Sequence, residues 1–249
     1  MKMFKLLKYE FRKTWYTKAI LLVLTLIAQA AFLIGIFFDK DETLGLSVAS
    51  LVMLATFGIM VIGLVSLIVF HQDLNTKQSY MLFMTPNSSY KILGAKALEN
   101  GLSVFLSGVF FALLGLADIS ILVAHEGDLM AVVDMFRSLI EQLQSYLVFD
   151  AKNIITVFFA GLSNWLMTLS AAFLAIVIAA TFLAGKKFSG VVSFLLFLLL
   201  IWGLEKVIGF IPDMSTLFMD MVLTAIASFV LMVVLYLVTG WIMDKKLSV

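Results

Sequence analysis

The chain has 249 residues, of which 63% are hydrophobic, 13% charged and 13% aromatic, and its mean hydropathy is +1.11. Soluble domains are about 45–50% apolar and about 25% charged, so this composition excludes an ordinary water-soluble fold. A net charge of only +1 argues against a nucleic-acid partner, and the absence of cysteine from the sequence excludes disulfides and thiolate metal sites.

The first segment, residues 1–17, carries apolar side chains three or four positions apart, with basic residues between them. The apolar positions are Phe4, Leu7, Phe11 and Trp15. This spacing is typical of a helix that lies in the headgroup layer with its apolar side toward lipid. A solvated segment that only supplies positive charge is the alternative interpretation.

Six uncharged stretches follow, each 17 to 33 residues long. A helix needs about 20 apolar residues to cross about 30 Å of hydrocarbon, so each stretch predicts one membrane span. The longest stretch is too short for two helices and a turn, and it therefore predicts one long span. We expect a single all-α transmembrane domain over residues 1–249, with spans at about 18–38, 46–70, 98–121, 154–183, 188–204 and 218–243.

The basic residues predict the orientation of these spans. Of the 17 Lys and Arg residues, 13 lie in the first 18 residues, the second and fourth connections and the C-terminal tail. Because cytoplasmic segments are enriched in Lys and Arg, both termini are predicted to be cytoplasmic. The apolar run of the first span is longer than the core of a signal peptide, so we expect an uncleaved helix. The sequence thus predicts a multi-pass protein of the cell membrane.

Three connections are predicted to lie on the outer side, and two of them have distinctive patterns. Residues 126–152 carry an apolar stripe at helical spacing opposite charged positions, which predicts an amphipathic helix too polar to span. Residues 205–220 contain Gly209 and Pro212 between short apolar pieces, and we expect a re-entrant hairpin there.

The second cytoplasmic connection, residues 72–97, has a distinctive order of residues. Its first half mixes polar and apolar positions, and Pro86 then forces Thr85 into an extended conformation. Asn87 or Ser88 can cap a new helix that leads through Lys96 into the third span. The pattern predicts a short helix, a rigid corner and a span, which together form a stiff lever on which a soluble partner can push.

This connection resembles the corresponding loop of permease subunits of ABC transporters, in the export class often called type two. Leu82, Thr85-Pro86 and Gly94-Ala95-Lys96 stand at the matching positions. The resemblance implies that residues 72–97, the coupling segment, dock on an ATP-binding subunit. An acidic residue that many members carry in this helix is replaced here by Lys77 and Gln78. The implied contact residues are Asp73, Asn75, Lys77, Gln78, Tyr80, Leu82, Phe83, Thr85 and Pro86.

The same resemblance implies the rest of the assembly. These permeases pair with a second copy or a related permease and with two ATP-binding subunits, and they are surrounded by membrane lipid. The chain has no Walker A sequence, so we expect no enzyme activity and no cofactor in this chain. ATP and Mg²⁺ would belong to the ATP-binding subunit. A bacterial source is likewise implied by the resemblance alone.

Several polar residues in or near the predicted spans are candidates for a functional role. Glu99, Asp118 and Glu205 fall near predicted span ends and are interpreted as interfacial, which disfavours a proton-coupled transporter. His71 and His125 are predicted on opposite sides of the membrane, which excludes a shared metal site within the chain. Gln29 and Asn164 are the candidate pathway residues. A row of Ala171, Ala175 and Ala179 suits close helix packing.

These features favour the membrane subunit of an ATP-driven exporter. Its Phe-rich and Met-rich spans suit a lipophilic or amphipathic cargo, such as a drug, a peptide or a lipid-linked molecule. The alternatives are an intramembrane enzyme, which requires a constellation of acids, His or activated Ser, and an ATPase-independent channel or immunity protein, which requires polar spans. The sequence displays neither pattern.

Overall fold

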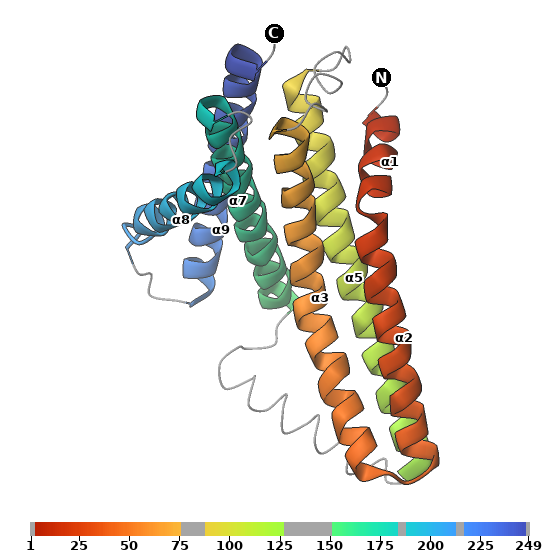
Figure 1. The fold of residues 1–249 in the computed structure, drawn as a ribbon. Coiled ribbons are helices and arrows are strands. Elements are labelled where there is room, and N and C mark those ends of the chain that lie inside the picture. The colour runs from red at the N-terminus through yellow and green to blue at the C-terminus, as the bar shows by residue number, and fades with distance from the viewer. Residues whose placement is uncertain (1–2, 76–87, 127–150, 184–187, 213–216, 248–249) are drawn as a thin grey trace. The chain divides into compact units, whose positions relative to one another are not determined.

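The computed structural model describes residues 3–75, 88–126, 151–183, 188–212 and 217–247, and every element within them is helical. In chain order these elements are α1 (Met3–Lys13), α2 (Trp15–Phe37), α3 (Asp41–Asn75), α5 (Ser89–Glu126), α7 (Ala151–Leu183), α8 (Ser189–Ile208), α9 (Leu217–Ile242) and the π-helical turn η1 (Met243–Leu247). Figure 1 shows their order along the chain.

Six of the described helices, α2, α3, α5, α7, α8 and α9, are long and apolar enough to cross a membrane. The shortest, α8, has 20 residues and is about 30 Å long at 1.5 Å per residue. The stretch expected as one long span is a single helix, α7, of 33 residues. The prediction of an all-α protein with six spans is therefore confirmed.

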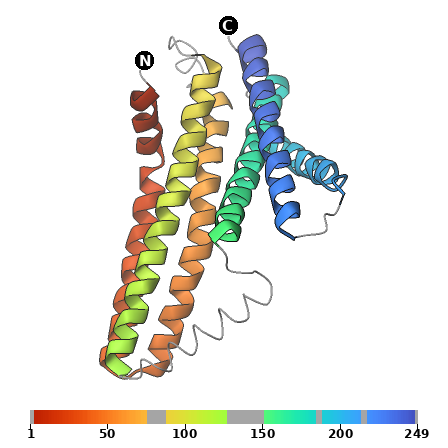
Figure 2. The ribbon, with the colours of Figure 1, turned by 180° about the vertical axis from the view of Figure 1, so that it is seen from behind.

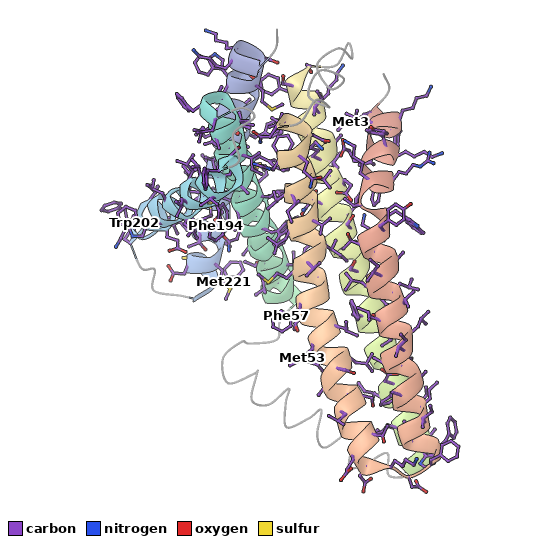
Figure 3. All side chains as sticks on the ribbon, in the orientation of Figure 1. Met3, Met53, Phe57, Phe194, Trp202 and Met221 are labelled. Atoms are coloured by element: carbon purple, nitrogen blue, oxygen red, sulfur yellow. The ribbon has the colours of Figure 1, made fainter. Side chains whose placement is uncertain are left out.

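The outward side chains of these helices are those of a lipid-facing surface. Figure 3 shows the sticks projecting from the spans, including Met53 and Phe57 on α3 and Trp202 on α8. These three side chains are 63%, 62% and 63% exposed. Large apolar side chains exposed along every span would be costly in water but are favourable in lipid.

The chain divides into two compact units, each described here by itself. The first contains residues 1–12, 66–99 and 149–249, and the second contains residues 13–65 and 100–148. In the first, α9 packs along α7, while α8 leaves α7 at a steep angle (Figure 2). Ala171, Ala175 and Ala179 are fully buried on α7, as expected for a row of small residues that permits close packing.

In the second unit, α2 and the parts of α3 and α5 within it run alongside one another (Figures 1 and 2). Phe32, Leu51 and Leu114 belong to the apolar cluster that joins them. Asn100, which is fully buried, donates a hydrogen bond from Nδ2 to the Gly63 carbonyl oxygen at 2.9 Å. α2 turns sharply into α3, with Asp39 at a φ of 49°. A Cβ on Gly35 would lie 2.9 Å from the Leu44 backbone, so this turn requires glycine.

α1 exposes one side and buries the other. Phe4, a member of the apolar stripe, is exposed on α1, whereas Trp15, another member, is the first residue of α2. The opposite side buries Leu6 and Glu10, and Leu6 packs against Ile92 and Ala95 of α5. Residues 127–150 lie outside the described residues, and so do residues 213–216 of the expected re-entrant hairpin. Both outer-side features stay predictions.

Candidate functional site

A buried lysine lies where α1, α3 and α5 meet. Lys96 Nζ on α5 donates hydrogen bonds to Glu10 Oε2 on α1 at 2.8 Å and to Asp73 Oδ2 on α3 at 2.7 Å. The same nitrogen lies 5.4 Å from the ring centroid of Phe70. We call Glu10, Phe70, Asp73 and Lys96 the Lys96 cluster.

The helical spacing explains why these side chains converge. Phe70 and Asp73 are three residues apart on α3, so they lie on the same side of that helix. Leu6 and Glu10 are four apart on α1, as are Ile92 and Lys96 on α5. Each helix thus contributes an apolar residue and a charged residue to the same junction.

Burial makes the ion pairs of this cluster important for stability. The side chains of Lys96, Glu10 and Asp73 are 2%, 5% and 3% exposed. Charges withdrawn from water are tolerated only when they are paired, and the removal of one partner leaves an uncompensated buried charge. The cluster therefore holds the end of α3, the start of α5 and α1 in one arrangement.

A second polar link joins the end of α3 to the start of α8. His71 Nε2 lies 3.2 Å from Ser189 Oγ, and Ser189 Oγ donates a hydrogen bond to Asn75 Oδ1 at 3.0 Å. Asn75 Nδ2 in turn donates to the carbonyl oxygen of His71 at 3.0 Å. Ser189 is buried and lies at the first residue of α8.

A third link joins the start of α5 to the end of α9. Tyr236 donates a hydrogen bond from its hydroxyl to the Tyr90 carbonyl oxygen at 2.6 Å. The Tyr90 ring rests against Gly240 so closely that a Cβ there would lie 2.2 Å from a ring carbon. Phe70, Leu93, Phe173 and Met243 form part of one apolar core beside these contacts.

All three links adjoin the two helix ends that border residues 76–87. α3 ends at Asn75 and α5 begins at Ser89, so whatever moves the chain between them acts directly on a braced pair of helices. The two helices are 35 and 38 residues long and continue from the first unit into the second.

The predicted coupling residues are only partly within the described chain. Asp73 and Asn75 lie in the last turn of α3, where both side chains are engaged by the links above. Lys77, Gln78, Tyr80, Leu82, Phe83, Thr85 and Pro86 lie outside the described residues.

The two candidate pathway residues lie in different units. Gln29 on α2 donates a hydrogen bond from Nε2 to Asp118 Oδ1 on α5. Asn164 is exposed on α7. Asp118 is predicted near the outer end of its span, and α5 continues for eight residues beyond it, to Glu126. A polar residue marks a gap in hydrophobicity and does not by itself end a helix.

Sequence reasoning missed the roles of Glu10 and Ser189. Glu10 stands among the basic residues of the first segment, and only its spacing of four from Leu6 indicates a side of the helix that the two residues share. Ser189 carries no such signal, because its partners His71 and Asn75 are more than 100 residues away.

The described residues contain no group of three or more His, Asp or Glu side chains arranged to hold a metal ion.

The six long apolar helices determine the structural class of the protein. This is a multi-pass helical membrane protein. A scan against protein-family models, a search of curated proteins and a search of solved structures each found no match. The likeness to ABC permeases therefore rests on the sequence pattern alone.

Proposed function

We propose that this protein is the membrane permease subunit of an ATP-driven exporter, with ATP hydrolysis on a separate ATP-binding subunit. The observation that carries the proposal is the Lys96 cluster, because it braces the helix ends on both sides of residues 76–87. A segment that receives force from a soluble motor needs such a rigid base, since a compliant base would absorb the movement.

The proposed coupling runs through α3 and α5. Closure of the ATP-binding subunits on ATP would push residues 76–87, and the ion pairs to Lys96 would make α3, α5 and α1 respond together. The link from Asn75 and His71 to Ser189 would pass part of the movement to α8. Interactions that exist in discrete packed arrangements convert small local shifts into larger movements of helices.

The proposed assembly contains a second permease, either another copy or a homologue, and two ATP-binding subunits. The cargo we propose is lipophilic or amphipathic, because the spans are rich in Phe and Met and carry few charges. Transport out of the cytoplasm follows from the resemblance to the export class.

Co-purification from the native membrane tests this proposal. The tagged wild-type protein should retain an ATP-binding subunit and show ATPase activity after reconstitution into lipid discs. Thr85→Ala and Pro86→Ala should each reduce the retained subunit several-fold. The matched control is Thr56→Ala, because the exposed Thr56 hydroxyl bonds only to carbonyl oxygens of its own helix. Unchanged retention in the Thr85 and Pro86 variants would show that the coupling assignment is wrong.

A further inference from the structure

The second unit contains a carboxyl group within its membrane-spanning helices. Asp118 on α5 accepts a hydrogen bond from Gln29 Nε2 on α2. Gln29 lies eight residues before the end of α2 and Asp118 eight before the end of α5, so each is about 12 Å of helix from that end. An ionisable side chain packed among apolar spanning helices is costly when charged.

Among the described residues, no cationic side chain pairs with Asp118. Phe32 on α2, Leu51 on α3 and Ile121 on α5 belong to the apolar cluster that joins these helices. Within the described residues, Asp118 forms no ion pair, and its one hydrogen bond is to Gln29.

The other titratable groups of the packed helices lie toward their ends. On α2, Lys18 donates to Ser103 Oγ at 2.7 Å. On α5, His125 contacts the ring of Phe37. On α3, Asp41 and Glu42 are exposed in the first turn. None of these groups is bonded to Asp118 in the described part of the chain.

One acceptor atom of the Gln29–Asp118 pair has no hydrogen-bond donor in the described structure. Gln29 Oε1 is buried and has no hydrogen-bond partner in the described structure. An ionised carboxyl only accepts hydrogen bonds, whereas a protonated one also donates through its O–H group. A neutral acid can therefore give Gln29 Oε1 its missing donor while accepting from Gln29 Nε2. Exchange of the amide O and N positions leaves the requirement unchanged, because Oε1 would then face the carboxyl and Nε2 would lack a partner.

The burial of Gln29 Oε1 also restricts what can supply that donor. An ammonium group of a ligand would need open access to the oxygen, and this atom has essentially no accessible surface. A proton on Asp118 needs no additional volume. We propose that Asp118 and Gln29 form a proton-binding site within the membrane, in which Asp118 is a neutral acid while α2 and α5 are packed together.

This site makes the packing of α2 on α5 depend on a proton. The proton stays on the Asp118 carboxyl, no covalent bond is made or broken except the O–H bond, and water is its acceptor on release. Loss of the proton leaves a carboxylate beside an apolar cluster and removes the donor that Gln29 Oε1 requires, so it weakens the contact between α2 and α5. The inference is independent of the proposed exporter function.

Infrared difference spectroscopy on the intact protein in lipid discs tests the inference. Subtraction of the Asp118→Asn spectrum from the wild-type spectrum at pH 7 should reveal the C=O stretch of a neutral carboxylic acid. Asp39→Asn is the matched control, because Asp39 is exposed in the turn between α2 and α3 and should contribute no such band. Absence of a neutral-acid band in the Asp118 difference would overturn the proposal.

A second variant covers the case in which Asp118→Asn does not fold. Gln29→Leu keeps the acid but removes its hydrogen-bond partner, so the carboxyl C=O band should move to higher frequency. An unchanged band would show that Asp118 and Gln29 are not paired, which would also overturn the proposal. Neither measurement requires an ATP-binding subunit.

Discussion

Lys96 on α5 and Asp73 on α3 form an ion pair, with Nζ and Oδ2 2.7 Å apart, beside the two helix ends that border residues 76–87. Both side chains are almost completely buried, and Glu10 of α1 contacts the same nitrogen. The pair therefore fixes the spacing of two long helices at the position where the proposed motor would act.

Replacement of Lys96 should destabilise the protein more than any exposed lysine replacement. Lys96→Met leaves Glu10 and Asp73 buried without their shared cation, at an expected cost of about 3–5 kcal/mol. The measurement is thermal or denaturant unfolding in mild detergent, followed by circular dichroism. Lys91→Met is the matched control, because Lys91 is exposed on the same helix and should change stability by no more than about 0.5 kcal/mol.

A double variant tests whether Lys96 and Asp73 interact in the folded protein. Asp73→Asn combined with Lys96→Met removes one of the two carboxylate charges left without their cation. The double variant should therefore lose less free energy of unfolding than the sum of the two single variants. Additive costs would mean that the two side chains do not interact in the folded protein.

Gly240→Ala should disrupt the contact between α9 and the start of α5. The new Cβ would lie 2.2 Å from the Tyr90 ring, so Tyr90 must move and its carbonyl bond to Tyr236 must weaken. We expect a loss of about 1–3 kcal/mol in unfolding free energy. Gly203→Ala on α8 is the control, since a Cβ there meets nothing within 4 Å and alanine is the better helix former. Equal effects of the two variants would argue against this contact.

Ser189→Ala should loosen the link between α3 and α8. The hydroxyl contacts both His71 and Asn75, which are half-buried, and its removal takes a hydrogen-bond partner from each, at an expected cost of about 1–2 kcal/mol. Ser193→Ala removes only a bond to the carbonyl oxygen of Ser189 in the same helix, so it should have a smaller effect. The difference between their unfolding midpoints measures the link between the helices, and its absence would contradict the geometry.

The sequence predicts the architecture well because a membrane imposes strong and local requirements. Runs of uncharged residues long enough to cross the hydrocarbon led to six spans, and six long apolar helices are present in the described chain. The helices extend beyond the predicted spans. α3 continues to Asn75 and α5 to Glu126, past the span ends predicted near 70 and 121, because a helix can continue through charges that reach water or a partner.

The interior of the site was predictable only in part. Asp73 and Lys96 were identified from the connection in which they lie, but their pairing with Glu10 joins residues 86 positions apart. Pairings of that range depend on how α1 packs on α5, through Leu6 and Ile92, and no local pattern encodes it. The sequence indicates Gln29 as a polar residue within a span and Asp118 as an interfacial residue, but it does not indicate that the two are hydrogen-bonded.

A single-cysteine cross-link tests the central claim most directly, and the natural absence of cysteine makes the starting protein suitable. Ser79→Cys lies within residues 76–87, and Ser138→Cys, in the predicted outer segment, is the matched control. We expect Ser79→Cys to be shielded from an impermeant maleimide in whole cells and to cross-link to an ATP-binding subunit with a yield that changes on ATP addition. Labelling of Ser79→Cys from outside the cell, or no cross-link to an ATP-binding subunit from the cytoplasmic side, would contradict the account.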